Sequence, residues 1–166
     1  MEKYLIDTNI FIESAYRFYA FDICPGFWDF LNKASNSKNI KSIIKVYEEL
    51  QPDKKELENF KEELKNKNFF LQIENIKYES YEKVSIALQK MKYSKEAVNK
   101  FSSGADYFLI ALAYQESYII VTHESKSKTI LKNQVKIPNL CEQLDIECID
   151  IAEFLRREKV QFILKE

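Results

Sequence analysis

Acidic side chains recur at places in the sequence from which they could reach one cleft. Asp7 follows the apolar run KYLI, and Glu124 comes just after the β-prone run YIIVT. Asp106 lies at the start of an apolar helical segment, and Glu48 and Glu49 lie late in another helical segment. In an open parallel sheet, side chains that follow the carboxyl ends of strands gather at one edge. We therefore treat these acids as candidates for a single site.

Carboxylates that converge cannot all stay ionised unaided. Two unit charges 4 Å apart repel by about 4 kcal/mol at an effective dielectric constant of 20. A divalent cation removes this repulsion, and Mg²⁺ prefers oxygen ligands. A bound cation also activates water and neutralises charge on phosphate oxygens, so a carboxylate cluster suits hydrolysis of a phosphodiester.

Each acid also has an ordinary structural explanation. Asp7-Thr8-Asn9 fits a turn and cap between a strand and a helix, because Asp, Thr and Asn all favour capping positions. Ser103-x-x-Asp106 fits a capping box. Glu48, Glu49 and Glu124 fit a solvated helix face and a polar loop. The residues alone leave both explanations open.

The elements that must position these acids alternate between strands and helices. Short β-prone runs predict strands at residues 3–6, 69–73, 118–122 and 147–151. Helical spacing of apolar residues predicts helices at 8–19, 27–31, 40–50, 54–66, 84–91 and 94–101, from 103 onward, over 140–144 and after 151. This alternation predicts one α/β domain over residues 1–166, whose parallel sheet carries helices on both faces.

Composition narrows the classes of protein that fit. The net charge is -1, so nothing in the total charge attracts nucleic acid, and phosphate binding needs a local basic patch or metal ions. Three cysteines, Cys24, Cys141 and Cys148, with a single histidine make a tetrahedral zinc site a poor fit. The sequence shows neither a signal peptide nor an apolar run of membrane length. We expect a cytoplasmic protein that has no membrane contact.

The chain resembles the PIN-domain family, which includes VapC-type toxin ribonucleases. The matching segments come in the family's order: LIDTNIFIE (5–13), VYEEL (46–50), GADYFLIALA (104–113), IIVTHE (119–124) and ECIDI (147–151). YAFDICPGFW (19–28) further resembles an uncharacterised prokaryotic PIN-like subfamily. The resemblance implies a three-layer α/β/α sandwich with a mainly parallel sheet of four or five strands. It also implies a metal-dependent ribonuclease that uses Mg²⁺ or Mn²⁺.

The resemblance also implies roles for individual residues. Asp7, Glu49, Asp106 and Glu124 fall at the positions of the family's four metal-binding acids, although the family usually has Asp where this chain has Glu124. On a helical wheel Glu48 and Glu49 flank the apolar face about equally. Glu49 is chosen because the family's acid is followed by an apolar residue. Thr8, Asn9 and Thr122 fall at the positions of residues that hold the site by hydrogen bonds.

Partners and substrate contacts follow from the same resemblance and from charge. An RNA substrate, an antitoxin protein in a toxin–antitoxin pair and a homodimer are the expected partners. His123, Lys126 and Lys128 come shortly after the predicted strand at 118–122 and are candidates for contacting RNA. The alternative is that they belong to an ordinary solvated loop. The densest aromatic cluster fits core packing or a dimer face better than base stacking; it comprises Tyr16, Phe18, Tyr19, Phe21, Phe27, Trp28 and Phe30.

Two other functions compete with the nuclease. A PIN-like domain that binds RNA or protein without turnover fits the Glu124 replacement and the weak total charge. A phosphatase would use Asp7 as nucleophile, but the DTN sequence lacks the second Asp, two residues on, that one large phosphatase class uses.

Overall fold

Five short parallel strands form the centre of the computed structural model, which describes residues 1–164. They are β1 (Tyr4–Ile6), β2 (Ile40–Ile43), β3 (Phe70–Leu71), β4 (Ile119–Val121) and β5 (Cys148–Ile149). Their order in the sheet is β3-β2-β1-β4-β5, and all four pairings are parallel. The prediction of a mainly parallel sheet of four or five strands is confirmed. Residues 165 and 166, the end of the expected 1–166 domain, lie outside the described residues.

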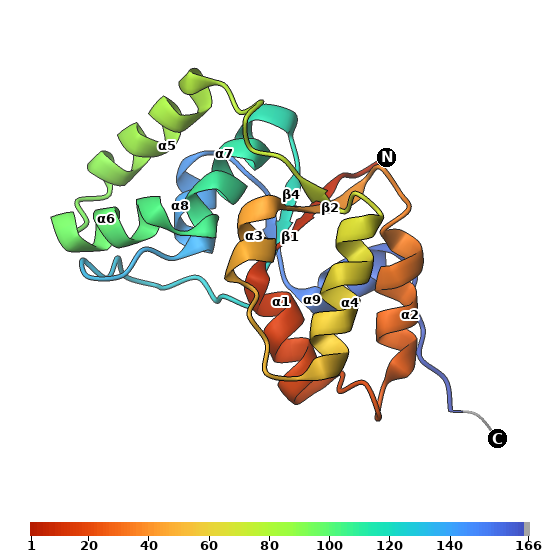
Figure 1. The fold of residues 1–166 in the computed structure, drawn as a ribbon. Helices are drawn as coiled ribbons and strands as arrows, with labels where there is room; N and C mark the ends of the chain where they lie inside the picture. The colour runs from red at the N-terminus through yellow and green to blue at the C-terminus, as the bar shows by residue number, and fades with distance from the viewer. Residues whose placement is uncertain (165–166) are drawn as a thin grey trace.

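Helices cover both faces of this sheet, as a three-layer α/β/α sandwich requires (Figure 1). One layer contains α5 (Tyr78–Lys90), α6 (Lys95–Ser103), α7 (Ala105–Glu116) and α8 (Ile137–Gln143), which contact one another and the sheet. The other contains α1 (Thr8–Glu13), which continues as the π-helix η1 (Ser14–Phe18), with α2 (Pro25–Ala34), α4 (Lys55–Asn66) and α9 (Ile151–Arg157). The short helix α3 (Ile44–Glu49) directly follows β2. Among residues 1–164, no helix has the length and apolar character needed to cross a membrane.

The order in which the chain adds strands to the sheet reverses direction beside β1. From β1 the chain adds β2 and then β3 on one side, and it returns through α5, α6 and α7 to place β4 on the other side. Asp7 follows β1 and Glu124 lies three residues after β4, so both lie at the carboxyl ends of the two central strands. This is the position at which open α/β sheets form ligand sites.

Residues 40–50 differ from the expected single helix, because the structure divides them into β2 and α3. All four residues of β2 are buried, including Lys41, whose ammonium donates to the carbonyls of Ser35 and Asn68. A strand that is buried on both faces shows no alternation of apolar and polar residues. The spacing of Ile43, Val46 and Leu50 therefore gave a helical pattern that runs through the strand.

Two helix starts also differ from the sequence expectation. Ser103 ends α6 instead of capping α7, and its hydroxyl donates to the carbonyl of Lys100. The helix expected over 140–144 begins earlier, at Ile137, so Asn139 lies inside α8. Its side chain instead donates to the carbonyl of Ser127 and accepts from the Ser127 N–H, which fixes the preceding loop.

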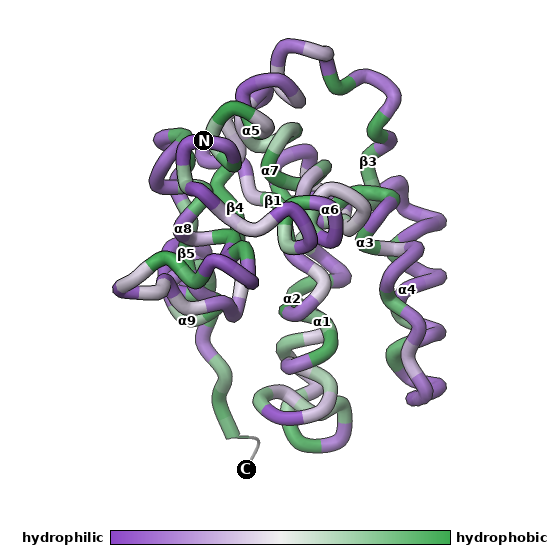
Figure 2. The backbone as a smooth tube through the Cα atoms, turned by 90° about the vertical axis from the view of Figure 1, so that its left-hand side faces the viewer, coloured by the Kyte–Doolittle hydropathy of each residue, from purple (hydrophilic) through white to green (hydrophobic). Residues whose placement is uncertain are grey.

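The aromatic cluster packs mainly within the chain. Phe21 stacks on Trp28, Tyr19 stacks on Phe27, and Trp28 meets Phe60 of α4 edge-on. The indole N–H of Trp28 donates to the carbonyl of Tyr19 at 2.6 Å. These contacts join α2 to α4, which is mainly hydrophilic on its outer side (Figure 2). Core packing, one of the two expected roles of the cluster, is confirmed for these rings.

Trp28 provides a test of this packing. Trp28→Ala should lower the free energy of unfolding by about 3–5 kcal/mol, because it leaves a cavity under Phe21 and removes a buried hydrogen bond. Ile23→Ala is the control: Ile23 is 80% exposed while Trp28 is 4% exposed, and its loss should change stability by less than about 0.5 kcal/mol. Urea unfolding followed by circular dichroism measures both. Equal losses would contradict the packing described.

Candidate functional site

Asp7 is held at the junction of the two central strands. Its side chain is 2% exposed, and its backbone N–H donates to the carbonyl of Val121 in β4. One carboxylate oxygen, Oδ1, accepts from the N–H of Thr8 at 2.6 Å, and the other, Oδ2, accepts from the hydroxyl of Thr122 at 2.7 Å. Both oxygens are therefore oriented by donors from separate parts of the chain.

Thr122 and Asn9 connect the end of β4 to the start of α1. The Thr122 hydroxyl accepts from the Asn9 amide at 3.0 Å and from the N–H of Glu124 at 3.1 Å. The Asn9 Oδ1 atom accepts from the N–H of His123 at 3.0 Å. This network fixes the backbone that carries Glu124 relative to Asp7. It gives Asn9 and Thr122 the contacts that a positioning role requires.

Glu49 and Glu48 lie in different surroundings. Glu49 Oε1 accepts from the N–H of Ala105 at 2.8 Å, and Glu49 Oε2 accepts from the hydroxyl of Thr8 at 3.1 Å. Glu48 points to solvent and pairs with Lys45 at 2.7 Å. Of the two adjacent glutamates, the structure therefore places Glu49 beside the starts of α1 and α7.

Glu49 also supplies the side-chain cap that Ser103 does not. Gly104 is the N-cap residue of α7, and it has no side chain to accept from the first free N–H groups. A Cβ atom at Gly104 would lie in ordinary contact with Glu49 Oε1, at 3.4 Å, so this carboxylate packs directly against the N-cap residue. A cap from a residue 56 positions away leaves no local sequence signal, and sequence reasoning therefore missed it.

Glu124 plays the same capping role at α8. Its Oε2 atom accepts from the N–H of Ile137 at 2.8 Å. Asp106, in the first turn of α7, has no hydrogen bond or ion pair to its carboxylate within residues 1–164. Its position at the positive end of the helix dipole favours the charged form.

The four acids lie close enough to affect one another's ionisation. Burial, together with the charges of Glu124 and Glu49, raises the pKa of Asp7 to about 7, against the hydrogen bonds from Thr122 and Thr8 that lower it. Burial, together with repulsion from Asp7, Glu124 and Glu49, raises the pKa of Asp106 to about 8. In the part of the chain that the structure describes, no Lys, Arg or His forms an ion pair with any of the four. Their charge is therefore uncompensated by protein cations.

The carboxylates do not form a preformed ligand shell. Within the described chain, no three His, Cys, Asp or Glu side chains already have the spacing to hold a metal ion. Glu49 has both oxygens occupied by hydrogen bonds, and Glu124 has one occupied. The acids are thus near enough to repel one another, but two of them are turned toward helix ends.

The residues expected to contact substrate lie in unequal settings. His123 is half-buried and stacks on Phe18 with ring centroids 5.1 Å apart, so it is not a freely solvated loop histidine. Burial lowers its pKa, and its buried Nε2 atom has no hydrogen-bond partner among residues 1–164. Lys126 and Lys128 are both exposed. The ammonium of Lys126 pairs with Glu142, whereas Lys128 has no ion pair among residues 1–164.

The raised pKa of Asp106 predicts a measurable cost of ionisation. The folded state holds this proton up to about pH 8, while an unfolded Asp releases it near pH 4, so stability falls as pH rises between these values. In EDTA at pH 8, Asp106→Asn should therefore melt about 2–5 °C above the wild type, and the gain should vanish near pH 4. Differential scanning fluorimetry across this pH range measures the effect. Glu48→Gln is the control and should show no such gain, and an Asp106→Asn protein that melts lower than wild type at pH 8 would refute the repulsion.

Comparison with known proteins gives a family but no characterised relative. No curated protein and no solved structure matches the chain. A family model described as a domain of unknown function, DUF4411, matches residues 4–162, which run from β1 to beyond α9 and include all four acids. Since this match spans nearly the whole sequence, the chain belongs to the DUF4411 family.

Proposed function

We propose that this chain is a metal-dependent ribonuclease that hydrolyses RNA phosphodiester bonds. The observation that carries the proposal is the group of four carboxylates at the switch in strand order, where burial and then mutual repulsion raise the pKa of Asp106 to about 8. Their uncompensated charge is what a divalent cation neutralises.

The donor set fits Mg²⁺ or Mn²⁺. Asp7, Glu49, Asp106 and Glu124 offer only carboxylate oxygens, which these hard cations prefer, and the set itself contains no cysteine or histidine of the kind that a softer metal prefers. The cation, when bound, would supply charge neutralisation at phosphate oxygens and an activated water. Binding would use the free Asp106 carboxylate, the unoccupied oxygen of Glu124 and the oriented oxygens of Asp7.

The surrounding residues hold these acids in place. Thr8 donates to both Asp7 and Glu49, through its N–H and its hydroxyl respectively. Thr122 donates to Asp7 and fixes the backbone of Glu124. Partners of this kind orient metal-binding carboxylates and keep them ionised. His123, Lys126 and Lys128 remain predicted RNA contacts, although the ion pair of Lys126 with Glu142 makes it a weaker candidate than Lys128.

The resemblance to PIN-like ribonucleases supports the same proposal and extends it. It implies an RNA substrate, an antitoxin partner and a homodimer. The three cysteines are unpaired, which fits a cytoplasmic protein. The dimer has less support than the sequence suggested, because most of the aromatic residues that pointed to it pack inside the chain.

A non-catalytic PIN-like domain that binds RNA or protein is the second candidate. The observation that favours it is the capping of α7 and α8 by Glu49 and Glu124, which gives both acids a structural role without a metal. A binding domain could therefore keep these glutamates after losing turnover.

Adding a cation provides a test that does not depend on turnover. Millimolar Mn²⁺ at pH 7.5 should raise the melting temperature of the wild type, since a ligand at 100 times its dissociation constant stabilises the fold by about 2.7 kcal/mol. Asp106→Asn should lose most of this gain. Scanning fluorimetry with Mn²⁺ and with EDTA measures it, and an undiminished gain in Asp106→Asn would place the cation elsewhere.

Cleavage separates the two candidates, and the adjacent glutamates supply a matched pair of variants. The wild type should cut single-stranded RNA in Mn²⁺, leave 5′-phosphate ends, as the resemblance implies, and stop in EDTA. Glu49→Gln keeps an acceptor for the Ala105 N–H but removes a charge, and it should lower the rate by at least about 100-fold. Glu48→Gln changes the adjacent glutamate, whose carboxylate pairs with Lys45 and not with the starts of α1 and α7, and it should cut at nearly the wild-type rate.

The RNA in this assay should be a broad transcript pool analysed by sequencing of 5′ ends, because VapC-type enzymes can be narrow in target. A pool left intact by a wild-type protein that does bind Mn²⁺ would favour the non-catalytic domain. If Glu48→Gln does not cut RNA and Glu49→Gln does, then Glu48 is the second acid of the site and the choice of Glu49 is wrong.

A further inference from the structure

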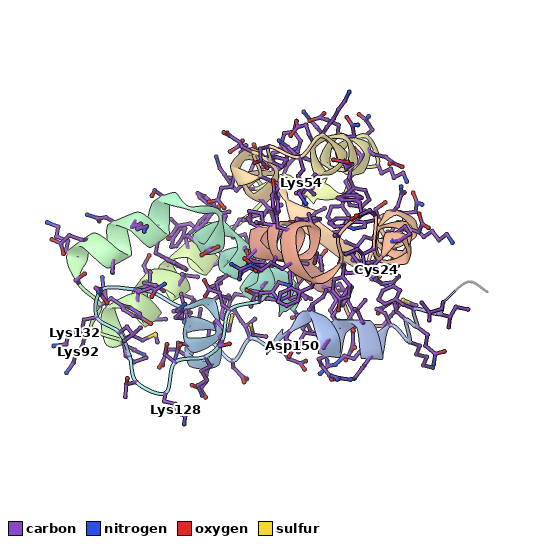
Figure 3. All side chains as sticks on the ribbon, turned by 90° about the horizontal axis from the view of Figure 1, so that it is seen from below. Cys24, Lys54, Lys92, Lys128, Lys132 and Asp150 are labelled. Atoms are coloured by element: carbon purple, nitrogen blue, oxygen red, sulfur yellow. The ribbon has the colours of Figure 1, made fainter. Side chains whose placement is uncertain are left out.

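One end of the molecule carries two short segments that are rich in lysine, each bordered by a glutamate, Glu96 or Glu124. Segments 90–95 and 125–134 hold six lysines and no Asp or Glu. The first segment joins α5 to α6, and the second is the loop between β4 and α8. The N–H of Ser94 donates to the carbonyl of Lys132 at 2.7 Å, which joins the two segments. Figure 3 shows Lys92 and Lys132 together at this end, with Lys128 on the same side.

Five of these lysines form what we call the lysine tip: Lys90, Lys92, Lys95, Lys128 and Lys132. All five are exposed, and none forms an ion pair within the described residues. Elsewhere several lysines have an acid one helical turn away, as in Lys45–Glu48 and Lys67–Glu63. The sixth lysine, Lys126, pairs with Glu142. In a chain of net charge -1, this local excess of free positive charge marks a surface for a polyanion.

Both segments lead directly to the acids of the candidate site. The second segment begins immediately after Glu124. The first continues into α6, which ends at Ser103, three residues before Asp106. At 1.5 Å per residue, the nine residues of α6 span about 13 Å between Lys95, at the tip, and Ser103, beside the start of α7. A single-stranded nucleic acid bound at the acids can therefore extend along α6 to the tip.

We propose that the lysine tip binds the sugar–phosphate backbone of the RNA strand, some nucleotides away from the phosphate held at the acids. The proposal rests on the proposed ribonuclease function for the identity of the polyanion. Lysine ammonium groups are point charges that suit repeated phosphates and read no sequence. An anionic membrane fits less well, because binding to a membrane surface uses the long apolar face of a helix, whereas the loop between β4 and α8 has no helix and exposes two large apolar side chains, Ile130 and Leu131.

Binding in EDTA tests the tip independently of cleavage. Fluorescence anisotropy of a labelled single-stranded RNA of about 20 nucleotides should show binding by the wild type that weakens with salt. The triple variant Lys92→Gln, Lys128→Gln and Lys132→Gln should bind at least about 10-fold more weakly at 0.1 M salt. Its log–log salt slope should be smaller by about 2, since each lost phosphate contact removes about 0.7 on a single strand.

The control removes the same charge elsewhere on the surface. Lys33, Lys38 and Lys55 are exposed and lie in or beside α2 and α4. Their triple change to Gln should leave affinity and slope within about 2-fold of the wild type. Equal losses in the two triple variants, no loss in either, or no binding by the wild type would each overturn the proposal. The proposal would also be overturned if the wild type bound vesicles with 30% phosphatidylserine more tightly than RNA and the tip variant lost this vesicle binding.

The two proposals fail in different ways in these experiments. If the wild type cuts RNA in Mn²⁺ while the tip variant binds RNA normally, the ribonuclease proposal is supported and the lysine-tip proposal is refuted. If the wild type never cuts RNA and only the tip variant loses binding in EDTA, the ribonuclease proposal is refuted, and the lysine tip is supported as an RNA-binding surface.

Discussion

Repulsion among the carboxylates around the buried Asp7 is the constraint on which this structure depends. Four acids from distant parts of the chain lie at one edge of the sheet, and burial together with mutual charge raises the pKa of both Asp7 and Asp106. Such an arrangement is unfavourable for a fold that has no other use for it. The donors that offset it are N–H and hydroxyl groups of the protein itself, mainly from Thr8, Thr122 and the first residues of α7 and α8.

The helix starts are therefore part of the same electrostatic arrangement. Glu49 and Glu124 each accept from a free N–H at the beginning of a helix that lies far from them in sequence or across a loop. An anion at a helix start is favourable both for the unpaired N–H groups and for the helix dipole. The same two contacts join α7 to the end of α3 and α8 to the loop after β4, so positioning of the acids and packing of this layer are achieved together.

The sequence predicted the layered fold and the region of the site, but not the details of either. The alternation of β-prone and helical segments was enough for a parallel sheet, because few other folds accommodate it. β2 was missed because a fully buried strand has no periodicity of its own, and because the buried Lys41 looks polar in sequence. The choice of Glu49 over Glu48 needed the family resemblance, because the helical wheel could not make it. The caps by Glu49 and Glu124 and the pairing of Lys126 with Glu142 are tertiary contacts, which leave no local pattern.

The hydrogen bond between Thr122 and Asp7 joins residues 115 positions apart, and it has a consequence for synthesis of the chain. β1 is made first, but its central neighbour β4 and the fourth acid come only after two thirds of the sequence has been translated. A nascent chain on the ribosome therefore has no complete acid cluster until Glu124 has left the exit tunnel. If the chain cuts RNA, as we propose, a growing chain gains this activity only after β4 has paired with β1 and Glu124 has emerged.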